Sequence, residues 1–361
     1  MALKILTIVG ARPQFVKAAV LSRQFAQYPD KINEIIVHTG QHFDVNMSDI
    51  FFQEMNIPQP DYHLEINSLS HGAMTGRMIE EIEKVIIKEK PDWVLVYGDT
   101  NSTLAGALAA VKLHVKVAHV EAGLRSFNMN MPEEINRILT DRISNALFCP
   151  TDTAIQNLKN EGFEHFPTEI IKSGDVMQDA AMYYAGKLNE RQLSLPPLPD
   201  QFILCTLHRA ENTDEPERLK NLVEALNHIH QNDYPVVIPL HPRTRNKISQ
   251  SGLVLKTMVL EPVGYFEMLF LLKHCTLVMT DSGGLQKEAF FFSKNCVTLR
   301  DQTEWIELID GGYNILAGAD KQKIISAVNL MLSKDNNFDV DLYGKGKAGQ
   351  LIANYFLKQC G

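Results

Sequence analysis

Short apolar runs alternate with amphipathic stretches along most of the chain. The runs are rich in Val, Ile and Leu and lack strict apolar–polar alternation, which indicates strands that are buried on both faces. Strands are expected at 3–9, 34–40, 93–98, 115–121, 146–150, 169–174, 202–207, 236–240, 257–262, 277–283 and 296–300. Helices are expected at 74–89, 133–145, 215–231, 265–274, 284–293, 304–310, 320–333 and 346–358. This alternation predicts βαβ units and an α/β fold with parallel sheets.

One segment interrupts the alternation. Residues 188–201 carry three prolines and little periodicity, which is typical of a linker. We therefore expect two Rossmann-like, doubly wound domains at 1–175 and 176–345, with the C-terminal stretch 346–361 packing back on the first. Ligands of such sheets bind beyond the carboxyl ends of the strands. The chemistry is thus expected at strand ends, in a cleft between the two domains.

Composition narrows the class of protein. The 361 residues are 45% hydrophobic and 22% charged, which is ordinary for a globular protein. The net charge of −8 argues against a general binder of nucleic acid or of anionic membranes. No apolar run approaches the roughly 20 residues of a membrane helix. The apolar start, MALKILTIVG, leads directly into a turn, so we interpret it as a buried strand and expect a cytoplasmic protein.

The first predicted strand ends in a turn with the sequence Gly10-Ala11-Arg12-Pro13-Gln14. Pro13 suits the first turn of a helix, and Lys17 follows one turn later. Arg12 and Lys17 would then lie at a helix N-terminus, where main-chain N–H groups already favour anions. They are interpreted as phosphate or sugar contacts, with two ordinary surface cations as the alternative.

A second turn of small residues follows the strand that ends at Asp281. Ser282, Gly283 and Gly284 open the next helix, and their exposed amides are expected to cradle a diphosphate. Glu288, about one turn further on, is a candidate acceptor for ribose hydroxyls. A Gly-Gly pair alone is a weak signal, and the strand before it and the helix after it strengthen the interpretation.

Two successive strands of the first half end in an acid, and a third acid opens the helix after them. Asp99 and Glu121 each end a strand, and Glu133 opens the helix that also carries Glu134 and Arg137. Glu133 and Arg137 are four residues apart, so they could simply form a salt bridge on one helix face. Three acids at one edge of a sheet need partners or a function, which favours a catalytic site.

The second half offers a histidine for acid–base chemistry. His208, followed by Arg209 and Glu211, ends one strand, and His241 ends the next. A lone histidine is more often a core residue, but His208 in this setting suits proton transfer near neutral pH. Arg300 adds a cation after another strand. The sequence has no HExxH motif and no CxxC pair, so we expect no metal site and five reduced cysteines.

Several of these segments together resemble the non-hydrolysing UDP-N-acetylglucosamine 2-epimerase family. The matching motifs span nearly the whole chain in order: GARPQ (10–14) with Lys17, TGQH (39–42), GDT (98–100), HVEAGLRS (119–126), PEEINR (132–137), HRAEN (208–212), TDSGGLQKE (280–288) and RDQTEW (300–305). The resemblance implies a GT-B-like architecture, a UDP-sugar substrate, a homodimer, and neither NAD nor a metal ion as cofactor.

The resemblance also implies a reaction and roles for the residues. UDP leaves C1 while the C2 proton is removed, and UDP then adds back to the 2-acetamidoglucal as a proton returns to the opposite face. The residues that match the family's catalytic set are Asp99, Glu121, Glu133, Arg137 and His208. Those expected to bind UDP are Arg12, Lys17, Arg209, Ser282, Gly283, Gly284, Glu288 and Arg300. A second, activating UDP-sugar would involve Gln41, His42, Glu134, Arg209 and His241.

One position departs from the common members of this family. They resemble GTRPE at the first turn, whereas this chain has Gln14 in place of the acid. This variation is similar to the branch that acts on 2,3-diacetamido-glucuronate or other modified UDP-sugars of surface polysaccharides. An acid removed from the neighbourhood of the sugar would ease the approach of a substrate carboxylate. The alternatives are a GT-B glycosyltransferase, a hydrolysing epimerase and a catalytically silent UDP-sugar sensor.

Overall fold

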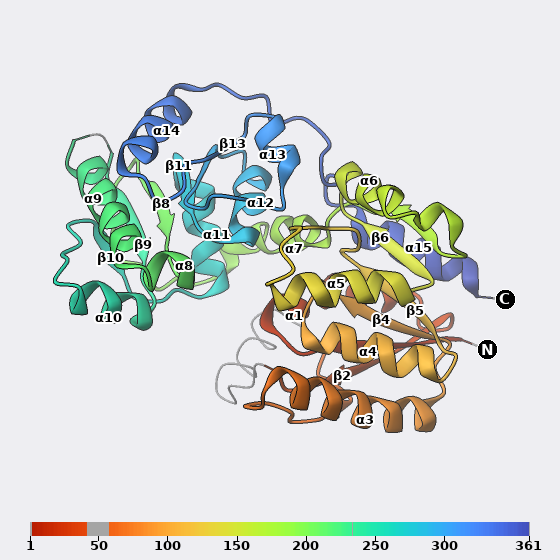
Figure 1. Ribbon diagram of the computed structural model, residues 1–361. Coiled ribbons are helices and arrows are strands. Elements are labelled where there is room, and N and C mark those ends of the chain that lie inside the picture. Colours follow the sequence, from red (N-terminus) through yellow and green to blue (C-terminus); the bar gives the residue numbers. More distant parts are fainter. Residues whose placement is uncertain (1, 42–57, 233, 361) are drawn as a thin grey trace. The chain divides into compact units, whose positions relative to one another are not determined.

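The computed structural model describes residues 2–41, 58–232 and 234–360, without the side chain of Arg12. The chain forms two compact units, residues 1–180 with 341–361 and residues 181–340. Each unit is built around its own parallel sheet with helices on both faces (Figure 1). The α/β class with two parallel sheets is therefore confirmed. Within these ranges, no helix is long and apolar enough to cross a membrane.

The sheet of the first unit has seven parallel strands in the order β3-β2-β1-β4-β5-β6-β7. The strands are β1 (Leu3–Val9), β2 (Ile32–His38), β3 (Tyr62–His63), β4 (Trp93–Tyr97), β5 (Lys116–Val120), β6 (Ala146–Cys149) and β7 (Glu169–Lys172). The order reverses between β1 and β4, which lie side by side and pair from Ile5–Trp93 to Ile8–Val96. In a doubly wound sheet such a reversal opens a crevice at the carboxyl ends of the strands.

Helices cover both faces of this sheet. They are α1 (Arg12–Phe25), α3 (His71–Glu89), α4 (Asn101–Lys112), α5 (Pro132–Ile143), α6 (Asp152–Asn160), α7 (Val176–Ala185) and α15 (Ala348–Gln359). α3, α4 and α5 lie next to one another, as Figure 1 shows. α15 returns from the end of the chain to pack on α1, where Phe356 makes edge contacts with Phe25 and Trp93.

The second unit has a six-stranded parallel sheet in the order β10-β9-β8-β11-β12-β13. Its strands are β8 (Ile203–Thr206), β9 (Val236–Pro239), β10 (Met258–Leu260), β11 (Leu277–Thr280), β12 (Cys296–Thr298) and β13 (Asn314–Leu316). Its helices are α8 (Ala210–Thr213), α9 (Pro216–Asn232), α10 (Pro242–Gln250), α11 (Tyr265–His274), α12 (Gly283–Phe291), α13 (Ile306–Asp310) and α14 (Lys321–Ser333). Here the order reverses between β8 and β11.

The proline-rich segment 188–201 does not separate the two units. Leu195 and Leu198 pack against the core of the second unit, beside Phe202 and Leu272. The chain passes between the units within α7, at residues 180 and 181, and again at 340 and 341. The prediction of a linker at this segment was therefore wrong, because its leucines bury apolar surface on α11.

Candidate functional site

Two acids of the first unit end neighbouring strands and each is paired with a cation. Asp99 follows β4 and forms a salt bridge with Arg137 of α5. Glu121 follows β5 and forms a salt bridge with Lys17 of α1. Lys17 is 9% exposed, so it is not the surface cation that the sequence left open as an alternative. The structure thus brings the predicted residues Asp99, Arg137, Glu121 and Lys17 into two ion pairs at one edge of one sheet.

The backbone of both turns adopts the left-handed conformation. Glu121 has a φ of 72°, which is unfavourable for a residue with a side chain and is often found at functional sites. Gly98 has a φ of +62°, and a Cβ atom there would lie 3.3 Å from the Lys17 Nζ and 3.4 Å from the Glu121 Oε2. Glycine at this position therefore lets the backbone before Asp99 approach the Lys17–Glu121 pair closely.

Consecutive acids of α5 have opposite environments. Glu134 is fully buried and accepts hydrogen bonds from the main-chain N–H groups of Ser126 and Phe127 and from Arg137. The side chain of Glu133 is exposed. The ion pair of Arg137 on its own helix is with Glu134, three residues away, at 2.8 Å. The sequence offered Glu133, four residues away, as a partner of Arg137, whereas the pair in the structure is with the buried Glu134.

Besides Glu134, two residues expected near an activating ligand, Gln41 and His42, belong to this unit. The Gln41 Oε1 accepts hydrogen bonds from the main chain and the hydroxyl of Ser102, so this side chain ties the loop after β2 to α4. His42 lies outside the described residues. For Arg12, the structure describes only the main chain, as the first residue of α1.

Gln14 has a role that the sequence did not reveal. Its side chain is 1% exposed; its Oε1 accepts from the amides of Gly10 and Ala11, and its Nε2 donates to the carbonyl of Tyr97 at 2.7 Å. A glutamate could accept the first two bonds but has no proton to donate to a carbonyl. The side-chain amide of Gln14 is therefore committed within the fold, and the expectation that the missing acid eases the approach of a substrate carboxylate stays a prediction.

In the second unit, a buried carboxylate organises the loop after β8. Asp281, fully buried, accepts hydrogen bonds from the amides of His208 and Arg209 and lies 3.0 Å from the His208 Nδ1. Burial opposes ionisation of Asp281, but the His208 side chain and these amides outweigh it and hold the pKa of the carboxyl below its ordinary value. The His208 side chain itself is 53% exposed, as a group that meets a ligand must be.

The turn between β11 and α12 differs in one detail from the expected cradle. The Ser282 amide donates to the Thr280 hydroxyl at 2.9 Å, so it is committed within the fold. Gly283 and Gly284 are the first residues of α12, and the Ser282 side chain does not cap the helix. A Cβ atom on Gly284 would meet nothing within 4 Å. The first turn of α12 thus offers open space at a helix N-terminus, which suits an anion.

Charged side chains surround this helix N-terminus. The Arg209 Nε donates to the carbonyl of Asp281, and a Cβ atom on Gly283 would collide with the Glu304 carboxylate and lie 3.8 Å from an Arg209 nitrogen. Arg300 is 2% exposed and pairs with Glu304 at 3.1 Å. The structure therefore places Arg209, Arg300, Gly283 and Glu304 together, and Glu288 follows on the same helix.

The remaining candidates of this unit are His241 and the cysteines. The exposed His241 caps α10, and its Nδ1 accepts from the Arg243 amide. Four of the five free cysteines are buried, and burial raises the pKa of the Cys275 thiol to about 12. Across residues 2–41, 58–232 and 234–360, no group of three or more His, Cys, Asp or Glu side chains has the arrangement of a metal site.

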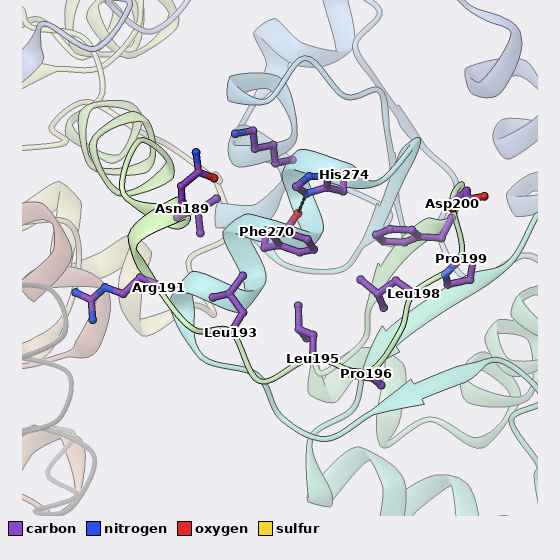
Figure 2. Close-up of a pocket in the computed structure, with 13 residues that line it drawn as sticks. Asn189, Arg191, Leu193, Leu195, Pro196, Leu198, Pro199, Asp200, Phe270 and His274 are labelled. Carbon is purple, nitrogen blue, oxygen red and sulfur yellow. Dashed lines mark hydrogen bonds between the residues drawn. The ribbon is translucent and has the colours of Figure 1, made fainter.

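A cavity of about 670 Å³ in the second unit lies apart from these residues. Figure 2 shows that it is bounded by the extended segment 188–200 and by α11, where the His274 Nδ1 lies 2.8 Å from the carbonyl of Phe270. Four leucines and two prolines of the segment contribute to its wall. It contains none of the predicted site residues, so it does not contribute to the candidate site.

Comparison with known proteins identifies the relatives of this chain. The sequence model of the family described as UDP-N-acetylglucosamine 2-epimerase matches residues 25–357. A Pseudomonas aeruginosa protein named UDP-2,3-diacetamido-2,3-dideoxy-D-glucuronate 2-epimerase is 60% identical over 99% of this chain and 100% of its own.

Solved structures agree with the sequence relatives. The Methanocaldococcus jannaschii UDP-GlcNAc 2-epimerase, in complex with UDP-GlcNAc and UDP, is 44% identical, with a TM-score of 0.87 over 99% of this chain and 100% of that one. The Neisseria meningitidis UDP-GlcNAc 2-epimerase bound to UDP-GlcNAc is 31% identical, with the same TM-score, 0.87, over 99% and 100%. The GT-B-like fold class predicted from the motifs is thereby confirmed, and the chain belongs to the UDP-N-acetylglucosamine 2-epimerase family.

Proposed function

We propose that this enzyme inverts C2 of UDP-2,3-diacetamido-2,3-dideoxy-D-glucuronate, without hydrolysing the sugar from UDP. The observation that carries the choice of substrate is the 60% identity, over the full length, to the Pseudomonas aeruginosa enzyme of that name. The relative named UDP-N-acetylglucosamine 2-epimerase from Methanocaldococcus jannaschii is 46% identical over 97% of the chain. A shared reaction with a modified sugar accounts for both similarities.

The acids of the first unit, two of which form ion pairs with a cation, suit the proton transfers of this reaction. Inversion requires removal of the C2 proton from one face and its return to the other, which takes two groups or one mobile group. Asp99, Glu121 and Glu133 are proposed for these transfers, with Arg137 orienting Asp99 through their salt bridge. The strained turn at Glu121 supports a catalytic role for its carboxylate.

The helix N-terminus and cations of the second unit suit the departing diphosphate. When the C1–O bond breaks, its electron pair leaves with UDP, and the new charge needs stabilisation. The amides of Gly283 and Gly284 with Arg209 and Arg300 are proposed to bind this diphosphate. The exposed ring of His208, oriented by Asp281, is proposed to donate to it. The other proposed UDP contacts are Arg12 and Lys17, at the start of α1, and Glu288, which would accept from the ribose.

An activating second UDP-sugar remains part of the proposal. Its candidate contacts are Gln41, His42, Glu134, Arg209 and His241.

Deuterium exchange tests this function directly. The purified protein is incubated in D₂O with the diacetamido-glucuronate nucleotide or with UDP-N-acetylglucosamine, and C2 is followed by NMR. We expect exchange and a C2-inverted nucleotide without added acceptor, and a higher kcat/KM for the uronate. Release of free sugar would indicate a hydrolysing epimerase, and turnover only with an acceptor would indicate a glycosyltransferase. A preference for UDP-N-acetylglucosamine would overturn the proposed substrate, and no exchange with either would support a sensor.

A cytoplasmic homodimer that supplies surface-polysaccharide precursors is the setting we propose. Large apolar side chains project from α5 and the loop before it: Phe127 is 76% exposed, Met129 59%, Ile135 40% and Leu139 45%. Ile135 and Leu139 are four residues apart and so share one face of the helix. Exposed apolar clusters of this kind often mark protein interfaces. Light scattering on Leu139→Lys should show a monomer if this face is the dimer contact.

A further inference from the structure

Three successive main-chain carbonyls lead to the acid at the end of β4, and a side chain donates to each. Gln14 donates to the carbonyl of Tyr97 at 2.7 Å, and Asn136 donates to that of Asp99 at 2.9 Å. The Nε2 of His119 lies 2.7 Å from the carbonyl oxygen of Gly98. The Asp99 turn is therefore fixed from α1, β5 and α5 together.

His119 differs from the other two because both of its ring nitrogens are engaged. The imidazole is fully buried, and its Nδ1 lies 2.7 Å from the Oδ1 of Asp141, which is also fully buried. A carbonyl oxygen can only accept a hydrogen bond, so the Nε2 that faces Gly98 must carry a proton. Whether Nδ1 also carries one depends on the charge of Asp141.

The surroundings of Asp141 favour its ionised form. Its Oδ2 accepts from the Arg125 Nη1 at 2.7 Å and from the Gly123 amide at 3.1 Å. Burial opposes ionisation, but His119 and Arg125 outweigh it and hold the pKa of Asp141 below its ordinary value. An ionised carboxylate only accepts, so the Nδ1 of His119 must donate as well.

Two further titratable groups lie near His119 and Asp141. Arg125 also pairs with Glu161, an exposed residue, at 2.7 Å, so its guanidinium bridges the buried Asp141 and a carboxylate at the surface. Burial, with Asp141 nearby, raises the pKa of Cys149 far above its ordinary value, which leaves that thiol neutral. A cationic ring is thereby compensated in a site from which water is excluded.

We propose that His119, held doubly protonated by Asp141, is a positioning residue that joins the two acid-bearing turns of the active site. The ring holds the turn of Gly98 and Asp99, and Asp141 holds the Gly123 amide two residues beyond Glu121. The proposal rests on the proposed epimerase function for its kinetic consequence only. The protonation of the ring follows from its two hydrogen bonds together with the ionised state of Asp141.

Nitrogen NMR of the full-length protein, labelled at histidine with ¹⁵N, tests the protonation at pH 8. Free histidines, with a pKa of about 6.5, are neutral there. We expect one ring with protons on both nitrogens, and its signals should be absent from His119→Gln. A His119 ring with one bare nitrogen at pH 8 would overturn the proposal. This measurement needs no substrate, so it stands even if the proposed function fails.

Kinetics of Asp141→Asn test the positioning role. We expect kcat to fall about 100-fold, as for a displaced catalytic group, with KM within about threefold of the parent. The ring of His119 should also lose one proton in this variant. Asn145→Ala is the matched control: it removes a 2.9 Å bond to the Val117 amide, near the opposite end of β5, and should leave kcat unchanged.

The same variants separate positioning from general stabilisation. A folded Asp141→Asn enzyme with kcat within about twofold of the parent would overturn the proposal, as would an equal loss in Asn145→Ala. If Asp141→Asn does not fold, the NMR spectrum of the parent decides the question.

Discussion

The two units hold their candidate residues in different ways. In the first, the acids Asp99, Glu121 and Glu134 each face a cation from a helix, so the site consists of side chains that neutralise one another. In the second, the buried carboxylate of Asp281 accepts hydrogen bonds from main-chain amides and leaves the His208 ring largely exposed. Paired acids suit proton transfer under fixed geometry, whereas open amides at a helix N-terminus suit an anion that comes and goes.

The largest expected effect is at a paired acid. Glu121→Gln removes the carboxylate beside Lys17, and C2 exchange should fall about 1000-fold or more because a proton-transfer group is lost. UDP affinity should change by less than about tenfold, or ~1.4 kcal/mol, if the second unit supplies most of the nucleotide contacts. Exchange is followed by NMR and affinity by calorimetry.

Glu80→Gln is the control for that variant, because it removes an acid from exposed pairs with Arg77 and Lys84 on α3. It should leave exchange and affinity unchanged. Near-parent exchange in Glu121→Gln would remove this residue from the proton transfers.

The next largest effect is a loss of stability, and it should differ between two consecutive acids of α5. Glu134→Gln turns an amide group toward the N–H donors of Ser126 and Phe127 and leaves Arg137 without its partner on the helix. The free energy of unfolding should therefore fall by about 3 kcal/mol. Glu133→Gln, at an exposed position, should change stability by less than about 0.5 kcal/mol. Urea unfolding of both variants measures the difference. Equal stabilities would show that burial of Glu134 carries little energy.

A smaller effect is expected at the anion site of the second unit. Gly284→Asp places a carboxylate in open space at the N-terminus of α12, where it suits the helix but repels a diphosphate. UDP affinity should fall at least about tenfold, or ~1.4 kcal/mol, while the protein stays folded. Gly76→Asp, also in open space but on α3, is the control. Unchanged UDP affinity in Gly284→Asp would mean that the diphosphate binds elsewhere.

The smallest effect involves an acid of the first unit outside the candidate site. Burial, opposed by hydrogen bonds from Thr7 and Ser22, raises the pKa of Glu34 to about 7. The folded state therefore binds a proton that the unfolded state releases, and this contribution to stability is lost as pH rises from about 4.5 to 7. Glu34→Gln should be about 1 kcal/mol more stable than the parent at pH 8 and not at pH 4. Equal denaturation midpoints at pH 8 would contradict this.

Much of the fold could be predicted from apolar runs alone. Of the eleven strands expected from those runs, all are present, whereas β3 and β13 were missed because they are two and three residues long. The pattern at 188–201 was misinterpreted because prolines also occur in extended segments that pack on a core. Apolar periodicity indicates what is buried and says little about where a proline-rich segment lies.

In the candidate site, too, local sequence patterns were found and contacts between distant residues were missed. The Asp281–Gly284 turn is local, so a strand followed by small residues was enough to find it. The roles of Gln14, His119 and Asp141 depend on bonds that span 83, 21 and 18 residues. A polar residue inside an apolar strand, as in the run that contains His119, is the signal that could have marked one of them.

The return of α15 to the first unit has a consequence for the order of synthesis. Residues 1–180 emerge from the ribosome with Phe25, Trp93 and Phe148 lacking the cover that Tyr355 and Phe356 later provide. The whole second unit is translated before that cover exists. The second unit can therefore complete its core first, and the first must wait, with an aromatic patch exposed to chaperones, for the last helix to arrive.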